Sequence, residues 1–244
     1  MLKAFILAAG LGTRLKPITD NIPKCLLPFG NKPLLQVTLE LLDQHGVDEV
    51  LVNSHAHYDS VKSFLDTLNL KKPHITCVYE HELLGSAGTL MANRDWIEDQ
   101  QPFLILYGDN LTNVNLSAMY SFHVTHGLPF TLGTFKTNAP NCCGIAEVGA
   151  DGVVESFEEK PRHPKSDLAA AGIYVTDRRI FDFFPQEAKL LKPLDLGFHI
   201  IPNLVGKMKS YFISDFLMDI GTPESYQAAQ MAYAEIFQAP VERI

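Results

Sequence analysis

The sequence predicts an α/β protein, built on a Rossmann-like, mainly parallel, twisted sheet flanked by helices, with a smaller β-rich extension. Two observations lead to this prediction. The first 110 residues alternate continuous apolar runs, typical of strands buried on both faces, with segments of helical spacing. The remaining residues are richer in β signals and contain no repeat, low-complexity tract or Gly/Ser linker, so we expect them to extend the same sheet.

Apolar runs form the predicted strands of the first half, at residues 2–8, 49–53, 75–80 and 103–107. Helical segments separate these strands, at residues 32–45 with Gly46 as a stop, at 59–68 with Asp59 as the predicted N-cap, and at 87–96. Strands that alternate with helices form βαβ units, and a sheet of such units binds ligands at the carboxyl ends of its strands.

The second half opens with a predicted helix at 116–126 and a strand at 130–135. Two short β-like segments, GIAEV and VVESF, then flank Asp151-Gly152, a dipeptide that favours the tight turn of a hairpin. A further strand is expected at 171–175. The C-terminal helix is expected at 222–237, with Pro223 in its first turn, where the fixed φ of proline suits a helix.

Composition excludes several classes of partner. The chain has 20 Lys and Arg against 28 Asp and Glu, a formal net charge of −8, which argues against nucleic acid or an anionic membrane. No apolar run approaches the roughly 20 residues that span a bilayer, and no cleavage pattern follows the N-terminal apolar stretch. The four cysteines lack C-x-x-C spacing, which is typical of reduced thiols in a cytoplasmic protein.

The segment LAAGLGTRLKP, residues 7–17, follows the first strand directly. Gly10 and Gly12 allow the backbone N–H groups to approach phosphate oxygens closely. Arg14 adds a permanently charged fork of donors, and Lys24 can add a second positive charge. No Gly-Lys-Ser/Thr triplet follows, which excludes a Walker loop, and Leu15 stands where a dinucleotide fingerprint needs Gly or Ala. A phosphate cradle and a plain glycine turn both fit these residues.

Segments from residue 7 to residue 226 resemble, in order, those of the sugar-1-phosphate nucleotidylyltransferases, also called sugar-nucleotide pyrophosphorylases. They are LAAGLGTRLKP, IPKCLLPFGNKPL, ELLGSAGTL, LYGDN, CGIAEV, FEEKP, AAGIYV and MDIGTPESY. The resemblance implies a GT-A-like nucleotidyltransferase fold in a single domain over residues 1–244. Residues 1–110 would form its nucleotide-binding half and residues 111–244 its sugar-phosphate-binding half.

The resemblance also implies a reaction, in which a sugar 1-phosphate attacks the α-phosphorus of a nucleoside triphosphate in line and releases pyrophosphate. A phosphate dianion is already a nucleophile, so the protein has to position it and neutralise charge. The implied catalytic residues are Arg14 at the pyrophosphate, Lys24 at the α-phosphate and Lys160 at the attacking phosphate. Asp109, at the end of the fourth strand, and Asp219 would hold Mg²⁺, which binds one or two carboxylates plus substrate phosphates.

Binding residues follow from the same resemblance. Those implied for the nucleotide are Leu7, Ala9, Gly10, Gly12, Thr13, Arg14, Lys24, Glu82, Gly85, Ser86 and Gly88. Those implied for the sugar phosphate are Asn110, Gly144, Glu159, Lys160, Ala170 and Gly172. Several have plainer interpretations when taken singly: Gly-Asp-Asn at 108–110 is turn chemistry, and Ser86 is a good helix start.

Two departures from the family pattern bear on the substrates. Ala170 stands where the family often has an Asn that touches the sugar, and His199 where an acidic residue is common. The motifs lean towards guanylyltransferases for mannose or heptose 1-phosphate, so GTP is favoured. Uridylyl or thymidylyl transfer to glucose or amino-sugar 1-phosphates is the alternative, and a homodimer is possible. A catalytically silent binding protein is disfavoured by the intact Asp and Arg positions, and an NAD-dependent oxidoreductase by Leu15 and Asn53.

Overall fold

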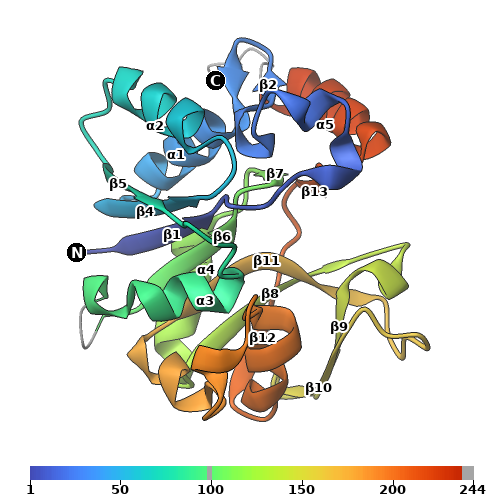
Figure 1. Ribbon diagram of the computed structural model, residues 1–244. Helices are drawn as coiled ribbons and strands as arrows, with labels where there is room; N and C mark the ends of the chain where they lie inside the picture. Colours follow the sequence, from blue (N-terminus) through green and yellow to red (C-terminus); the bar gives the residue numbers. More distant parts are fainter. Residues whose placement is uncertain (98–100, 238–244) are drawn as a thin grey trace, which may run out of the picture.

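The computed structural model describes residues 1–97 and 101–237, and its main feature is a nine-stranded sheet that draws strands from both halves of the chain (Figure 1). The strands of this sheet are β1 Lys3–Leu7, β4 Glu49–Ser54, β5 His74–Tyr79, β6 Phe103–Tyr107, β8 Phe130–Lys136, β9 Gly144–Val148, β10 Val154–Glu159, β11 Leu168–Thr176 and β12 Met208–Phe212. Their order is β10-β9-β11-β6-β1-β4-β5, and β8 pairs with both β11 and β12.

The centre of the sheet is parallel, since β1 pairs in parallel with β4 and β6, and β4 pairs in parallel with β5. Beyond β6 the sheet becomes mixed, because β11 runs antiparallel to β6, β8 and β9. This arrangement confirms the predicted mainly parallel sheet with a β-rich extension. The predicted hairpin is also confirmed, because β9 and β10 pair antiparallel.

Five α-helices, two small sheets and several short 3₁₀ or π segments complete the regular structure in the described ranges. The helices are α1 Leu34–Gln44, α2 Tyr58–Thr67, α3 Ser86–Ala92, α4 Leu116–His126 and α5 Pro223–Ile236. The small sheets pair β2 Pro28–Phe29 with β3 Lys32–Pro33, and β7 Asn110–Thr112 with β13 Leu217–Asp219. None of these helices combines the length and the apolar character that a membrane crossing would need.

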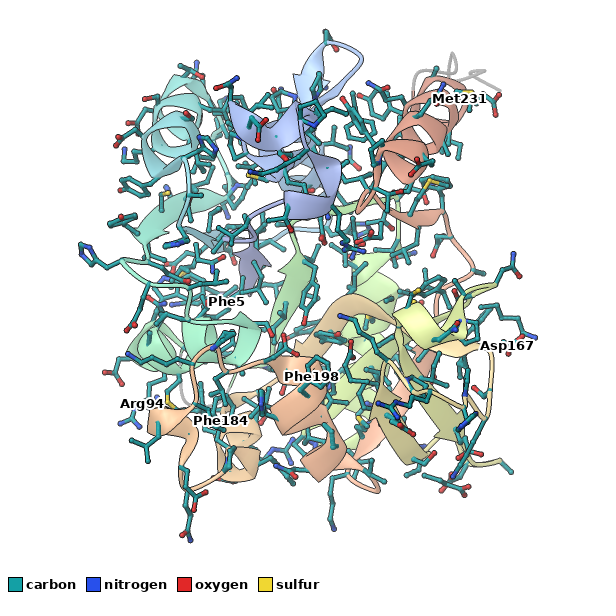
Figure 2. All side chains as sticks on the ribbon, turned by 45° about the vertical axis from the view of Figure 1, so that its right-hand side comes forward. Phe5, Arg94, Asp167, Phe184, Phe198 and Met231 are labelled. Carbon is teal, nitrogen blue, oxygen red and sulfur yellow. The ribbon has the colours of Figure 1, made fainter. Side chains whose placement is uncertain are left out.

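Alternating side chains of the central strands are buried on opposite faces of the sheet. Ile6 of β1 packs in the core beneath α1, α2 and α4, together with Leu39 and Met119. Phe5, its neighbour in sequence, packs in the core on the other face beside Leu90 of α3 (Figures 1 and 2). Burial on both faces explains why these strands have continuous apolar runs in the sequence.

The structure corrects four local predictions. Lys32 and Pro33 pair with β2 as strand β3, so α1 starts at Leu34 and not at residue 32. Asp59 lies in the first turn of α2, and the residue before that helix is His57, in a left-handed conformation with φ 58°. The helix expected at 87–96 ends at Ala92 and is followed by a separate 3₁₀ turn at Arg94–Trp96. Strand β6 ends at Tyr107, so Asp109 lies in the turn beyond it.

The β7–β13 pair joins the middle of the chain to its C-terminal part. Residue Asp219 is the register partner of Asn110, and the Ile220 N–H donates to the Asp109 carbonyl over 3.0 Å. Helix α5 follows directly and is anchored on the N-terminal half, because the Tyr226 hydroxyl donates to the Pro28 carbonyl over 2.8 Å. Segments far apart in the sequence are therefore neighbours.

The N-terminus of α5 is capped by side chains. The Thr222 hydroxyl accepts from the Ser225 N–H over 3.2 Å, and the Ser225 hydroxyl accepts in return from the Thr222 N–H over 3.0 Å. We expect Thr222→Ala to lower the free energy of unfolding by about 1 kcal/mol, because a helix N–H loses its acceptor. The measurement is urea-induced unfolding. Thr222→Ser is the matched control and keeps the stability, whereas equal losses in both variants would contradict a capping role.

Candidate functional site

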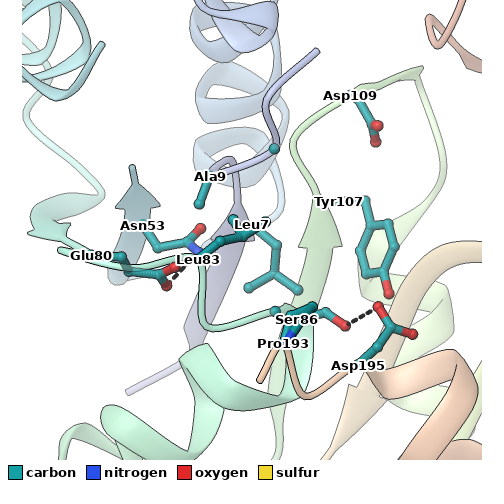
Figure 3. Close-up of a pocket in the computed structure, with 12 residues that line it drawn as sticks. Leu7, Ala9, Asn53, Glu80, Leu83, Ser86, Tyr107, Asp109, Pro193 and Asp195 are labelled. Carbon is teal, nitrogen blue, oxygen red and sulfur yellow. Dashed lines mark hydrogen bonds between the residues drawn. The ribbon is translucent and has the colours of Figure 1, made fainter. Parts of the chain in front are cut away.

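Three adjoining pockets open at the carboxyl ends of the parallel strands, and Asp109 lines all three. The loop pocket, of about 260 Å³, lies beside the β5–α3 loop and is lined by Leu7, Ala9, Gly10, Asn53, Glu80, Leu83, Gly85, Ser86, Tyr107, Asp109, Pro193 and Asp195 (Figure 3). The sheet pocket, of about 320 Å³, lies against β9 and β11. A small pocket of about 40 Å³ lies at Lys24 and includes Leu7 and Gly10.

The glycine-rich turn after β1 forms one edge of the loop pocket. Gly12 has φ +64°, a left-handed conformation that glycine adopts readily, and its carbonyl accepts from the Thr19 hydroxyl over 2.8 Å. The turn continues as a short 3₁₀ segment that exposes Arg14 and buries Leu15 completely. Leu15 therefore anchors the turn in the core, which is the physical role of the residue that departs from the dinucleotide fingerprint.

Lys24 sits between two carboxylates that come from distant segments. Its ammonium lies 2.6 Å from an Asp109 oxygen and 3.9 Å from an Asp219 oxygen, and its side chain is only 11% exposed. Burial, together with the nearby Asp109 carboxylate, raises the pKa of Asp219 above its usual value, while Lys24 and Arg14 oppose the shift. The two aspartate carboxylates thus place negative charges close together, and this arrangement favours a bound cation.

This pair of carboxylates fits a Mg²⁺ ion. Mg²⁺ takes oxygen ligands and is commonly bound by one or two carboxylates, with phosphate oxygens and water completing its shell. Asp109 and Asp219 supply such oxygens side by side. No cluster of three or more His, Cys, Asp or Glu that could hold a metal occurs within residues 1–97 and 101–237.

A buried carboxylate lines the loop pocket. Glu80 is 4% exposed and accepts from the Asn53 amide over 2.8 Å (Figure 3). It also accepts from the Thr89 hydroxyl over 2.5 Å. The other Glu80 oxygen accepts from the Leu84 N–H over 3.3 Å. Asn53 also accepts from the Ala8 N–H over 2.7 Å, which ties this network to the glycine turn. The sequence analysis did not select Glu80, although its place at the end of a parallel strand was a usable signal.

The N-terminus of α3 is held against a segment from the second half of the chain. The Ala87 and Gly88 N–H groups both donate to the Leu194 carbonyl over 3.0 Å. Gly85 has φ +83°, and a Cβ there would collide with the same carbonyl. The Ser86 hydroxyl donates to Asp195 over 3.0 Å (Figure 3). Gly85 and Ser86 therefore line the loop pocket because residues 194–195 fix them.

Asp195 lines both the loop pocket and the sheet pocket, and the sequence analysis missed it. One of its oxygens accepts from Ser86, and the other accepts from the Gly197 and Phe198 N–H groups over 2.8 and 3.1 Å. Its own N–H donates to Nδ1 of His199 over 2.9 Å. The histidine that departs from the family pattern therefore helps to hold the turn that carries Asp195.

Glycines shape the wall of the sheet pocket. A Cβ at Gly144 or at Gly197 would collide with the Glu159 carboxylate, so these two residues leave the space that this group occupies. Gly172 has φ +68°, and a Cβ there would lie 2.9 Å from the Asn110 amide nitrogen. That amide donates to the Ala171 carbonyl over 2.9 Å. Small residues on β9 and β11 thus allow Glu159 and Asn110 to reach the same pocket.

Lys160 lies at the mouth of the sheet pocket with an unusual backbone. Its φ is +51°, in the left-handed region that lysine rarely adopts, and its N–H donates to the Cys143 carbonyl over 3.0 Å. Its ammonium lies 4.0 Å from a Glu159 oxygen. The predicted Glu159-Lys160 pair is therefore presented together at one edge of this pocket.

Most of the residues implied by the resemblance line one of the three pockets. They are Leu7, Ala9, Gly10, Arg14, Lys24, Gly85, Ser86, Asp109, Asn110, Gly144, Glu159, Lys160, Ala170, Gly172 and Asp219. Gly12, Thr13, Glu82 and Gly88 line none of them. Glu82 forms an ion pair with Lys192 instead, and Gly88 packs against Leu84 and Leu194.

Comparison with known proteins agrees with this arrangement. A family model described as nucleotidyl transferase matches residues 3–236, and the chain belongs to this family. Mannose-1-phosphate guanylyltransferase 1 of Arabidopsis thaliana is 32% identical over 96% of the chain, and mannose-1-phosphate guanyltransferase of Schizosaccharomyces pombe is 29% identical over 95%. The chain spans 65% and 64% of the lengths of these two relatives.

Solved structures show the same fold. HddC from Yersinia pseudotuberculosis has a TM-score of 0.78 at 24% identity, with 96% of this chain and 100% of that chain covered. A UDP-glucose pyrophosphorylase complexed with UDP-glucose has a TM-score of 0.81 at 22% identity, with 96% and 99% covered. The predicted GT-A-like nucleotidyltransferase fold is therefore confirmed.

The environment of Glu159 leads to a pH-dependent prediction. Burial raises the pKa of Glu159, Asp195 adds to the rise, and Lys160 opposes it. The folded protein therefore keeps a proton at this carboxyl at pH values where the unfolded chain has lost it, so stability falls as the pH rises above the usual Glu range. We expect the Tm of Glu159→Gln to exceed that of the wild type by a margin that grows between about pH 4 and pH 8.

Thermal unfolding across this pH range checks the prediction. Glu158→Gln is the matched control, because Glu158 is an exposed neighbour on the same strand. Its Tm difference from the wild type should not grow with pH. A Glu159→Gln margin that shrinks as the pH rises would contradict a raised pKa at Glu159.

Proposed function

We propose that this protein joins a sugar 1-phosphate and a nucleoside triphosphate to give a nucleotide sugar and pyrophosphate. The observation that supports it is the cluster of Lys24, Asp109 and Asp219, which lies where the three pockets meet, beneath a glycine turn that carries Arg14. An acidic protein with this local concentration of cations and paired carboxylates suits substrates that are polyphosphates.

Each of the two larger pockets then has an occupant. The loop pocket receives the nucleotide, since it combines the glycine turn with the buried polar network of Asn53 and Glu80. The sheet pocket receives the sugar phosphate, with Glu159 placed for sugar hydroxyls and Lys160 for the phosphate. We also propose that residues 1–244 form a single domain. Residues 1–110 are its nucleotide-binding half and residues 111–244 its sugar-phosphate-binding half.

The chemistry requires positioning more than proton transfer. A phosphate oxygen of the sugar 1-phosphate forms a bond to the α-phosphorus as the bond from that phosphorus to the bridging oxygen breaks, and pyrophosphate leaves with the electron pair. Lys160 holds the attacking phosphate, Lys24 neutralises the α-phosphate and Arg14 stabilises the departing pyrophosphate. Asp109 and Asp219 would hold Mg²⁺, which would supply neutralising charge for the reacting phosphates.

GTP and mannose 1-phosphate or heptose 1-phosphate are the favoured substrates in this proposal. Glu80 orders the wall of the loop pocket in this proposal, through its bonds with the Asn53 amide and the Leu84 N–H. The relatives named as mannose-1-phosphate guanylyltransferases support the same choice. A homodimer and a cytoplasmic location stay predictions of the sequence.

Substrate profiling tests the proposal. We expect pyrophosphate release to be fastest with GTP and mannose 1-phosphate or heptose 1-phosphate in a panel of GTP, UTP, dTTP and CTP against mannose, heptose, glucose and glucosamine 1-phosphates with Mg²⁺. A preference for UTP or dTTP would overturn the choice of base alone. Absence of turnover with every pair would overturn the enzymatic proposal and favour a binding protein.

Replacing either aspartate tests the metal assignment. We expect Asp109→Asn and Asp219→Asn each to lower Mg²⁺-dependent kcat by about a hundredfold or more, because the ion that neutralises the reacting phosphates loses a charged ligand. Steady-state kinetics over a Mg²⁺ titration measure the loss, and circular dichroism shows whether the fold is kept. Asp66→Asn, on the exposed surface of α2, is the control and retains the wild-type rate. Wild-type kinetics in either active-site variant would refute the assignment.

A further inference from the structure

Phe198 is a large apolar side chain that is exposed inside a polar site. It lines the sheet pocket and is 54% exposed, although its main chain is fixed by the bond from its N–H to Asp195 (Figure 2). Phe198 lies in the short helical segment Leu196–Ile200. The start of this segment is also fixed, because the Leu196 N–H donates to the Ser86 hydroxyl over 2.7 Å. Packing in the core therefore does not explain the position of this ring.

Besides the neighbouring His199 ring, whose centroid lies 6.3 Å away, the Phe198 ring contacts a cation. The Lys160 ammonium lies 5.7 Å from the centroid of the Phe198 ring, within the range of a cation–π interaction. The backbone of Lys160 is fixed by its bond to the Cys143 carbonyl and by Pro161, which follows it. The backbone is thus held rigidly, while the four-carbon side chain has freedom that only its neighbours can restrict.

Two neighbours compete for this ammonium. Glu159 lies 4.0 Å away, and a close ion pair with it would neutralise the positive charge that a phosphate needs. The Phe198 ring attracts the ammonium through its quadrupole but carries no net charge. An ammonium held over the ring therefore keeps its full charge for an incoming anion.

We infer that Phe198 is a positioning residue, whose ring holds the Lys160 ammonium at the mouth of the sheet pocket, ready for the phosphate of the sugar 1-phosphate. The inference rests on the proposed function for the identity of that anion. It requires an aromatic ring at position 198, and an apolar side chain of similar size does not replace it.

Kinetics of a matched pair of variants test the requirement. We expect Phe198→Leu to raise KM for the sugar 1-phosphate about fivefold, with KM for the nucleoside triphosphate unchanged within about twofold. Phe198→Tyr keeps the ring and should restore the wild-type KM. Phe212→Leu is the control, because Phe212 is a comparably exposed phenylalanine (52%) on β12 outside this pocket. Equal effects of the Leu and Tyr variants would overturn the inference.

A double-mutant cycle separates this role from direct contact between ring and sugar. In a Lys160→Ala background, Phe198→Leu should have no further effect on the affinity for the sugar 1-phosphate, because the ring acts through the lysine. A persistent fivefold loss of affinity in that background would overturn the inference, since the ring would then contact the sugar itself.

A measurement on the substrate-free protein does not depend on the proposed function. Protons of the Lys160 side chain that lie over the ring should be shifted upfield in NMR spectra of the wild type and of Phe198→Tyr, and the shift should vanish in Phe198→Leu. Absence of this shift from the wild type would overturn the inference whatever the enzyme transfers. If the upfield shift is present but no substrate pair is turned over, the contact between Lys160 and Phe198 is established and only the proposed function is contradicted.

Discussion

The arrangement of the site depends on one interaction, the contact of the Lys24 ammonium with the carboxylates of Asp109 and Asp219. Two carboxylates at close range repel one another, and a buried lysine beside them offsets that repulsion. Strands β7 and β13 force the two aspartates together, because Asp219 and Asn110 are register partners. Although the net charge of the protein is −8, this cluster combines a lysine, which favours phosphate groups, with two carboxylates, which favour a cation.

The pockets on either side of this cluster are built by segments that meet only in the folded chain. Leu194 and Asp195 fix the start of α3 through backbone and side-chain bonds, so the second half of the chain shapes a pocket whose other walls come from the first. Gly144 and Gly197 leave room for Glu159 in the same way. The stable sheet supplies the frame, and irregular segments at its carboxyl edge supply most of the polar groups.

The sequence was sufficient for the central strands because burial on both faces leaves an unmistakable apolar run, as at β1 and β6. It was insufficient for β7, whose three residues are too few to show a period. Glu80 and Asp195 were missed for a different reason. Their importance comes from partners on other elements, Asn53 and Ser86, and no local pattern records such partners.

The fit of Gly85 against the Leu194 carbonyl constrains how this chain can change over generations. Any side chain at 85 would displace an oxygen that two N–H groups share, so a single substitution there is deleterious unless the backbone near 194 shifts at the same time. Two positions coupled in this way are expected to change only together. Diversity in the molecules that relatives accept is therefore expected to accumulate around this glycine rather than at it.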